Sequence, residues 1–251
     1  MRKPKRFLVL QTGDTIPSVR TQHGGFEQMY TQALRLGEGS SDLQIETIDL
    51  TERTSGAGLP DPREFTGIVM TGSAAMLGEN TPWMQMGCRY LETVLKHQAP
   101  FLGVCFGHQM LGQVAGGQVG PNPHGREMGT VRVYLNEQTD PFFTQFPNSF
   151  LAQVTHVDVV LERSSEITSC GQSAHDGNHM IHVGPHAYGV QFHPEFSHHV
   201  ISAYLRDRQA IFDQERGSGT CQLRLETVRE TPFAARILAL FREHAQSIQS
   251  R

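Results

Sequence analysis

Residues 101–110 read FLGVCFGHQM, a short apolar run that ends at a cysteine with a glycine two positions before it and another two positions after it. Gly103, Cys105 and Gly107 form a G-x-C-x-G arrangement, which is the thiol version of the nucleophile elbow. In such an elbow a buried strand turns sharply into a helix, and the neighbours of the strained central residue must lack Cβ atoms. The stretch therefore predicts an α/β fold with Cys105 at the carboxyl edge of a sheet, where open α/β folds place their ligands.

Outward from this stretch, apolar runs of strand length alternate with segments of helical period, which is typical of βαβ units and of a largely parallel sheet covered on both faces. We expect strands at residues 6–11, 43–50, 67–72, 100–105 and 187–196. We expect helices at residues 25–36, 81–97, 106–117, 197–212 and 231–246. The stretch 129–160 lacks a helical period and is rich in β-formers, so it predicts some antiparallel strands.

The composition limits the classes of partner. The chain has 251 residues and a formal net charge of −4, so nothing favours nucleic acid or an anionic membrane as the main partner. The basic opening MRKPKR is followed only by FLVL, which is too short for the core of a signal peptide, and no apolar run reaches the length of a membrane span. We expect a cytoplasmic protein that forms a single domain over residues 1–251, because no polar linker divides it.

The position of Cys105 favours chemistry at its sulfur. A helix that begins at Phe106 directs its free N–H groups and its positive dipole end toward that sulfur, which favours the thiolate. The alternative is a buried cysteine at an ordinary turn between glycines. The remaining cysteines lack the short paired spacings of zinc sites and are not arranged as a disulfide framework, so we interpret them as small buried side chains. They are Cys88, Cys170 and Cys221.

A thiol nucleophile needs a base that takes its proton and returns it to the leaving group, and histidine is the usual residue at neutral pH. Thirteen histidines are available. The stretch GVQFHPEF singles out His193 at the end of an expected strand, with Glu195 two residues later. In extended chain these two side chains point to the same side, so the carboxylate can fix the imidazole tautomer. The alternative is an ordinary turn after the strand, stiffened by Pro194.

The segments GVCFGHQ (103–109) and GVQFHPE (189–195) together resemble the triad-type, or class I, glutamine amidotransferases. The resemblance extends to MTGSAAML (70–77), GGQV (116–119) and THVD (155–158), and covers about residues 7–212, followed by a C-terminal helix at about 231–247. It implies a flavodoxin-like three-layer sandwich: a mostly parallel central sheet with helices on both faces and a few extra antiparallel strands.

The resemblance also implies roles for individual residues. Cys105 would be the nucleophile, His193 the general base and then acid, and Glu195 its orienting partner. The oxyanion would be held by backbone N–H groups of Phe106 and of the loop at Gly72 and Ser73.

Four further residues correspond to the positions where the family grips glutamine. They are Gln109, Thr155, His156 and Val157. Thr155 replaces the more usual serine and keeps the hydroxyl. The alternatives are a solvated helix glutamine for Gln109 and a hydrogen-bonded strand histidine for His156.

The expected function is hydrolysis of the glutamine side-chain amide through a cysteine thioester, with ammonia released to an unknown acceptor on a separate synthetase subunit. The segment TGSAAMLGENTPWM resembles that of stand-alone members labelled as similar to the glutaminase part of GMP synthase. Two alternatives stay open. The same triad could serve a stand-alone γ-glutamyl hydrolase or peptidase, or the chain could be a catalytically silent interaction module.

A run of histidines in HDGNHMIHVGPH, residues 175–186, has spacings that would suit metal ligands on one helical face. Gly177, Gly184 and Pro185 interrupt a helix there, and no carboxylate or cysteine completes a convincing set. We therefore expect no metal site and no cofactor.

Overall fold

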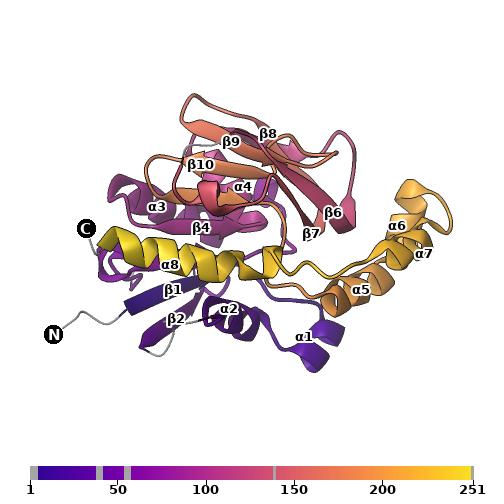
Figure 1. The fold of residues 1–251 in the computed structure, drawn as a ribbon, viewed down its shortest axis with the longest axis horizontal. Coiled ribbons are helices and arrows are strands. Elements are labelled where there is room, and N and C mark those ends of the chain that lie inside the picture. Colours follow the sequence, from indigo (N-terminus) through magenta and orange to yellow (C-terminus); the bar gives the residue numbers. More distant parts are fainter. Residues whose placement is uncertain (1–4, 38–41, 54–57, 138–139, 250–251) are drawn as a thin grey trace.

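A nine-stranded sheet forms the centre of the molecule, in the order β2-β1-β3-β4-β11-β10-β9-β6-β7 (Figure 1). This computed structural model describes residues 5–37, 42–53, 58–137 and 140–249. The parallel half consists of β1 (Lys5–Gln11), β2 (Leu43–Asp49), β3 (Gly67–Met70), β4 (Phe101–Val104) and β11 (Ala187–Val190). The antiparallel extension consists of β10 (Met180–Val183), β9 (Ile167–Gln172), β6 (Glu127–Leu135) and β7 (Ser149–His156).

Alternation along β1 divides the apolar side chains between the two faces of the sheet. Phe7 and Val9 belong to one buried cluster, whereas Leu8 and Leu10 belong to the other. The first cluster is completed by the helices α2 (Phe26–Leu34) and α8 (Ile237–Gln249), and the second by α3 (Pro82–Lys96) and α4 (Phe106–Val114). The three-layer architecture with helices on both faces, expected from the sequence, is confirmed.

The register of the parallel strands brings distant segments together at one edge. β4 and β11 are neighbours, and Val104 pairs with Val190 at their carboxyl ends. The residues that directly follow these two strands must therefore emerge side by side. Cys105 follows β4, and His193 follows β11 by three positions.

The antiparallel strands expected within residues 129–160 are present as most of β6, β7 and β8 (Asp158–Glu162). β6 and β7 pair over most of their length, from Glu127 opposite His156 to Tyr134 opposite Ser149. β8 forms a separate two-stranded sheet with β5 (Gln118–Pro121). The polar segments that become β9 and β10 have no clear alternation, and the sequence did not predict them as strands.

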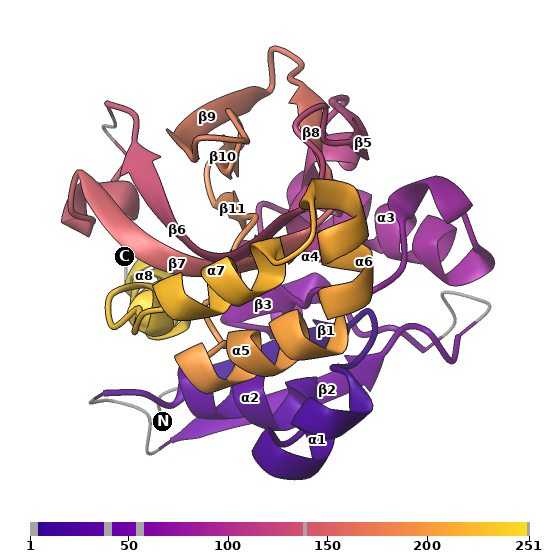
Figure 2. The same ribbon diagram turned by 90° about the vertical axis from the view of Figure 1, so that its right-hand side faces the viewer.

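The single continuous helix expected over residues 197–212 is wrong, because the segment forms two helices. The chain forms α5 (His198–Asp207) and α6 (Gln209–Arg216), separated by Arg208 at φ −102° and ψ 13°. The stretch 213–222, for which no helix is expected, contains the end of α6 and the start of α7 (Thr220–Thr227). α5, α6 and α7 lie together at one end of the molecule (Figure 2).

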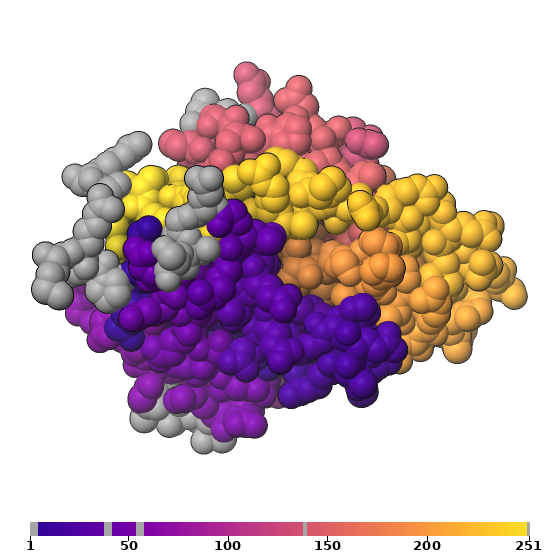
Figure 3. Space-filling model, turned by 60° about the horizontal axis from the view of Figure 1, so that its bottom comes forward, coloured from indigo at the N-terminus to yellow at the C-terminus, as the bar shows by residue number. Residues whose placement is uncertain are grey.

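The remaining helices differ from expectation at their ends. α1 (Pro17–His23) was not expected, and the C-terminal helix begins as a 3₁₀ turn, η4 (Ala234–Arg236), before α8. In Figure 3 the indigo surface of the N-terminal segment meets the orange surface of the α5 region, and α1 contacts α5. Within the described ranges, no helix combines the length and apolar character needed to cross a membrane.

Candidate active site

Cys105 occupies the sharp turn between β4 and α4 with φ 51° and ψ −100°, angles that an L-residue rarely adopts. A Cβ on Gly103 would lie 2.3 Å from the carbonyl oxygen of Gly107, and a Cβ on Gly107 would lie 2.6 Å from that of Met70. Both glycines are thus required by the backbone packing, which is the geometry of a nucleophile elbow. The backbone N–H of Cys105 donates to the carbonyl of Val190 at 2.8 Å and holds the turn against β11.

His193 and Glu195 form a buried pair on the neighbouring segment. Nδ1 of His193 lies 2.7 Å from Oε1 of Glu195, and their side chains are 4% and 0% exposed. The backbone N–H of His193 donates to the carbonyl of Gln153 at 2.8 Å, and its ring stacks on Phe196 with centroids 4.2 Å apart. The imidazole is therefore fixed by a hydrogen bond, a backbone anchor and an aromatic surface.

The position of Gly72 shows that Cys105 and His193 approach the same point. A Cβ on Gly72 would lie 2.8 Å from Cε1 of His193 and 3.5 Å from Cβ of Cys105. The sulfur and the imidazole thus meet above the loop that follows β3. Only a glycine leaves room for both.

Burial by itself would lower the pKa of His193, but the Glu195 carboxylate and Cys105 outweigh it and raise that pKa to about 10. The imidazole therefore keeps a proton through the neutral range. An imidazolium beside a cysteine is the arrangement that favours a thiolate.

The loop after β3 supplies one side of the expected oxyanion site. The hydroxyl of Thr12 bonds to the carbonyl oxygens of Thr71 and Gly72 at 2.9 and 3.0 Å, and so fixes the loop. The N–H of Gly72 donates to the hydroxyl of Tyr30 at 3.3 Å. Across the described ranges, the Ser73 and Phe106 amides have no intramolecular acceptor. Of the two loop residues expected to serve the oxyanion, this geometry favours Ser73.

A pocket of about 300 Å³ opens at this edge of the sheet. Its walls include Cys105 and His193 together with Ser73 and all of the expected substrate residues, Gln109, Thr155, His156 and Val157. The structure therefore gathers at one pocket residues that the sequence pattern assigned from four separate segments.

The contacts of the substrate residues show which groups remain for a ligand. The side-chain N–H of Gln109 donates to the carbonyl of Asp158 at 2.7 Å, so its Oε1 is the free end. The hydroxyl of Thr155 accepts from Arg208 at 3.3 Å. The carbonyl of Val157 accepts from the N–H of Asn122 at 2.8 Å.

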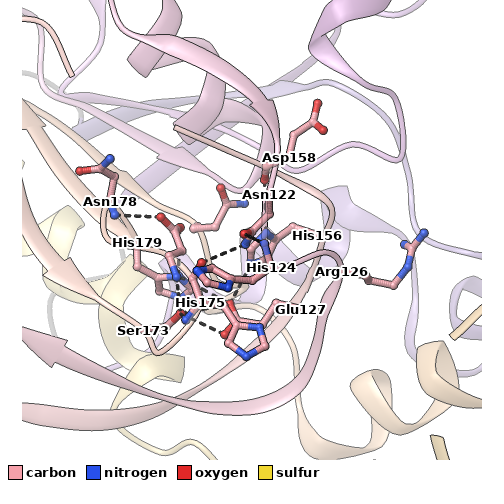
Figure 4. A network of polar contacts seen from close by, with 12 residues as sticks. Asn122, His124, Arg126, Glu127, His156, Asp158, Ser173, His175, Asn178 and His179 are labelled. Atoms are coloured by element: carbon pink, nitrogen blue, oxygen red, sulfur yellow. Dashed lines mark hydrogen bonds and ion pairs between the residues drawn. The ribbon is translucent and has the colours of Figure 1, made fainter. Parts of the chain in front are cut away.

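Both ring nitrogens of His156 are engaged away from a ligand, in a buried polar network (Figure 4). Nδ1 lies 3.2 Å from the carbonyl oxygen of Asp158, and Nε2 lies 3.0 Å from Oε2 of Glu127. Burial would raise the pKa of Glu127, but the hydrogen bond from His156 and the nearby His179 hold it below its ordinary value. The hydroxyl of Ser173 donates to the same carboxylate at 3.0 Å.

The candidate metal ligands of the described chain are Glu127, His156 and His179. Each offers one donor atom, and these atoms all lie within 4.8 Å of one another. The shortest separation, 3.0 Å between His156 and Glu127, is that of a direct charge-assisted hydrogen bond. Nδ1 of His179 lies 3.3 Å from Oδ2 of Asp176. We interpret this cluster as an ion-pair network that holds the end of β7, where the pocket begins.

Sequence reasoning missed Arg208, which lines the pocket from the break between α5 and α6. Its guanidinium lies over the ring of Tyr204, with 5.3 Å between its carbon and the centroid, and burial lowers its pKa. Arg126 on the same wall is paired with Glu215 at 2.9 Å, whereas Arg208 has no ion pair with an acidic side chain of the described chain. Arg208 lies in the charged run Arg-Asp-Arg of a helical segment, and this pattern does not indicate a binding residue.

Comparison with known proteins matches residues 25–210 to the family model described as glutamine amidotransferase class-I. γ-Glutamyl peptidase 5 of Arabidopsis thaliana is 28% identical over 209 residues, which are 80% of each chain. A subunit of the glutamine-hydrolyzing GMP synthase of Ignicoccus hospitalis is 33% identical over 141 residues, which are 55% of this chain and 71% of the relative.

Solved structures agree in fold. A glutamine amidotransferase from Thermotoga maritima superposes with a TM-score of 0.71 at 21% identity and covers 100% of both chains. A glutamine amidotransferase from Methylobacillus flagellatus gives 0.64 at 17% identity, over 98% of this chain and 93% of the other. These likenesses establish the flavodoxin-like arrangement of the central sheet and its helices.

Proposed function

This chain belongs to the class I glutamine amidotransferase family, and we propose that Cys105 is the nucleophile with which it hydrolyses the side-chain amide of glutamine and releases ammonia. The observation that carries the proposal is the meeting of three segments at Gly72. There Cys105, on a strained elbow, lies beside His193, which Glu195 orients at 2.7 Å.

In the first half of the reaction, the thiolate of Cys105 attacks the amide carbon and the carbonyl oxygen becomes an oxyanion. The N–H groups of Phe106 and Ser73 are the donors available to that oxygen. His193 then gives its proton to the amide nitrogen, the carbon–nitrogen bond breaks, and ammonia leaves a glutamyl thioester.

In the second half, His193 takes a proton from water and the resulting hydroxide attacks the thioester. The carbon–sulfur bond breaks and glutamate leaves, so that glutamine and water have become glutamate and ammonia. Glu195 holds the imidazole in the tautomer that both steps need.

The acceptor of the ammonia is proposed to be a small molecule on a separate synthetase subunit, because the GMP synthase relatives are named as subunits of a glutamine-hydrolyzing synthase. Gln109 and the backbone of residues 155–157 would hold the glutamine. We retain the cytoplasm as the expected location and a single domain as the expected organisation.

A second candidate is a stand-alone γ-glutamyl peptidase, in which an amine rather than ammonia leaves. It is supported by the likeness to γ-glutamyl peptidase 5, which extends over 80% of both chains. The same thioester serves both reactions, because only the group on the amide nitrogen differs.

The test is a substrate panel with the purified chain. We expect ammonia and glutamate from L-glutamine, with a rate at least about 10³-fold lower in Cys105→Ala. A strong preference for γ-glutamyl dipeptides would replace the first candidate by the second. If neither substrate is hydrolysed and no synthetase subunit co-purifies, the chain is a silent module and the proposal is wrong.

A further inference from the structure

Tyr30 lies on α2, and its hydroxyl reaches the loop that follows β3. Its side chain is fully buried, with 0% exposure, and its ring packs edge-on against Phe26 with centroids 5.9 Å apart. It does not line the substrate pocket. A phenol in this place can therefore affect the reaction only through the protein groups that its hydroxyl contacts.

The hydroxyl of Tyr30 is the acceptor of one hydrogen bond in the structure. It accepts the N–H of Gly72 at 3.3 Å, at the start of the loop whose next residue, Ser73, faces the pocket. The orientation of the peptide at Gly72 also determines the direction of the following amide. The phenol oxygen is thus an anchor for the oxyanion loop.

The hydroxyl proton of Tyr30 needs an acceptor of its own, because a buried donor without one is costly. Oε1 of Glu195 is occupied by His193, whereas Oε2 of the same carboxylate is fully buried and has no hydrogen-bond partner. The loop at Gly72 brings the phenol near this carboxylate: a Cβ on Gly72 would lie 3.6 Å from Nδ1 of His193, which bonds to Glu195, and the N–H of Gly72 bonds to the Tyr30 hydroxyl. Burial raises the pKa of the phenol well above its ordinary value, and the charge of Glu195 raises it further. Tyr30 is therefore protonated across the working pH range and can donate.

We propose that Tyr30 is a positioning residue that donates its hydroxyl proton to Oε2 of Glu195 while it accepts the N–H of Gly72. One buried oxygen then ties the carboxylate that orients His193 to the loop that faces Cys105. This inference rests on the proposed function, because it assigns Tyr30 to the same reaction.

Loss of the hydroxyl would affect both of its contacts. Glu195 would keep one buried oxygen without a donor, and its charge would concentrate on the oxygen that accepts from His193. The N–H of Gly72 would lose its acceptor, and the peptide before Ser73 would be free to turn. Binding of substrate would change little, because Tyr30 is outside the pocket wall.

The test is Tyr30→Phe, which removes one oxygen, compared with Tyr90→Phe. Tyr90 on α3 is also buried, at 7% exposure, and its hydroxyl donates to the carbonyl of Pro60 at 3.0 Å on the other face of the sheet. We expect Tyr30→Phe to lower kcat about tenfold while KM stays within about twofold, and Tyr90→Phe to change neither. Site-specific 3-fluorotyrosine at position 30 keeps the hydroxyl and should retain native kcat. Equal kcat in Tyr30→Phe and the native chain would overturn the proposal.

A second readout does not depend on turnover. The Nδ1–H proton of His193 is expected in the downfield region of the proton NMR spectrum because it lies in a short bond to a carboxylate, and Glu195→Gln identifies it by its loss. In Tyr30→Phe the resonance should move further downfield, since the carboxylate has lost a competing donor. An unchanged resonance contradicts the role of Tyr30 even if the chain does not hydrolyse glutamine. A native chain without amidase activity but with a shifted resonance in the variant would contradict only the proposed function.

Discussion

Cys105 holds a backbone conformation that the two flanking glycines make possible, and each glycine meets a different obstacle. Gly103 faces the first turn of α4 and Gly107 faces the end of β3. Because these obstacles arise within one turn and its nearest strand, the G-x-C-x-G pattern between an apolar run and a helical segment predicted the elbow. The strain at Cys105 is local and is readable from local sequence.

Gly103→Ala should destabilise the fold itself, because the new methyl group would lie 2.3 Å from the carbonyl oxygen of Gly107. We expect a loss of about 3 kcal/mol in the free energy of unfolding, measured by guanidinium denaturation. Gly78→Ala is the matched control, since a Cβ there meets nothing within 4 Å. Equal stabilities of the two variants would mean that the turn is less tightly packed than described.

Arg208→Gln should weaken binding of substrates that carry a free α-carboxylate. The guanidinium on the pocket wall has a hydroxyl and an aromatic ring as neighbours but no acidic partner in the described chain. An incoming carboxylate would therefore form an ion pair with it. We expect KM for L-glutamine to rise about tenfold with kcat little changed, while KM for the α-amide of glutamine stays as in the native chain. Steady-state kinetics with both substrates measure this.

The control for that prediction is Arg206→Gln, which removes an exposed arginine two residues away on α5. It should leave both substrates unaffected. The same tenfold increase for the α-amide as for glutamine would show that Arg208 acts on the shape of the pocket and not on a carboxylate.

Tyr30 and Arg208 could not be predicted from the sequence for a common reason. Each acts on a residue from a distant segment: Tyr30 on Gly72, and Arg208 on Thr155. Neither lies in a short motif of its own. Residues whose role depends on the packing of one helix against another carry no local signal, whereas Cys105, His193 and Glu195 lie in short motifs next to the strand ends that place them.

Among the elements, β6 and β7 meet the loop after β9 through the buried carboxylate of Glu127. The pKa of Glu127 is lower in the folded chain than its ordinary value of 4.5. The stabilisation is therefore fully present above that value and is lost as the pH falls through the lower, folded value. This pair fixes the end of β7, from which Thr155 and the following residues line the pocket.

Glu127→Gln should lower the free energy of unfolding by about 3 kcal/mol at pH 7, because it removes the buried carboxylate that bonds to His156 and Ser173. The difference between the native chain and the variant should shrink as the pH falls below 4.5. Urea denaturation at a series of pH values measures this difference, with Glu162→Gln at the exposed end of β8 as the control. A difference that stays constant with pH would contradict the ionised pair.

The elements themselves were predictable to different degrees. The parallel strands and α2, α3 and α4 follow from continuous apolar runs and clear helical periods, and the structure confirms them. In β9 and β10, polar residues such as Ser169 and His182 stand among buried residues without a regular alternation. These two strands pair with each other and with the neighbouring strands β6 and β11. The break at Arg208 was missed because the helical period continues through it, while contacts with Tyr204 and Thr155 hold its side chain.

For the whole molecule, the expectation of a single domain over residues 1–251 stays a prediction. The lone tryptophan, Trp83, packs against Phe106 with ring centroids 5.5 Å apart, so its fluorescence reports on the core beneath the elbow. Far-UV circular dichroism reports on all helices and strands together. We expect both signals to change in one coincident guanidinium transition. Separate midpoints for the two signals would show that the chain contains two folding units and would contradict the expectation of a single domain.

Most of α6 and all of α7 lie beyond the residues that the family model matches, and α6 contributes Ile211 to the pocket wall. Glu215 on α6 holds Arg126 on the pocket wall, and the side chain of Arg216 donates to the carbonyl of Arg126 at 2.5 Å. The proposed triad was readable from short motifs that resemble those of the family. Part of the pocket wall, at Arg208 and Ile211, comes from the region of α5 and α6, where the sequence has no motif that indicates a site.

The central claim is that Cys105 reacts because His193 and Glu195 activate it, and its internal competitor is Cys88. Cys105 is only 4% exposed, whereas Cys88 is partly exposed and burial raises its pKa. The measurement is peptide mass spectrometry after brief treatment with a diazoketone analogue of L-glutamine, in the native chain and in His193→Ala. We predict one adduct per chain, on Cys105, that forms far more slowly in the variant. An adduct on Cys88 with Cys105 unmodified, or the same rate without His193, would contradict the account.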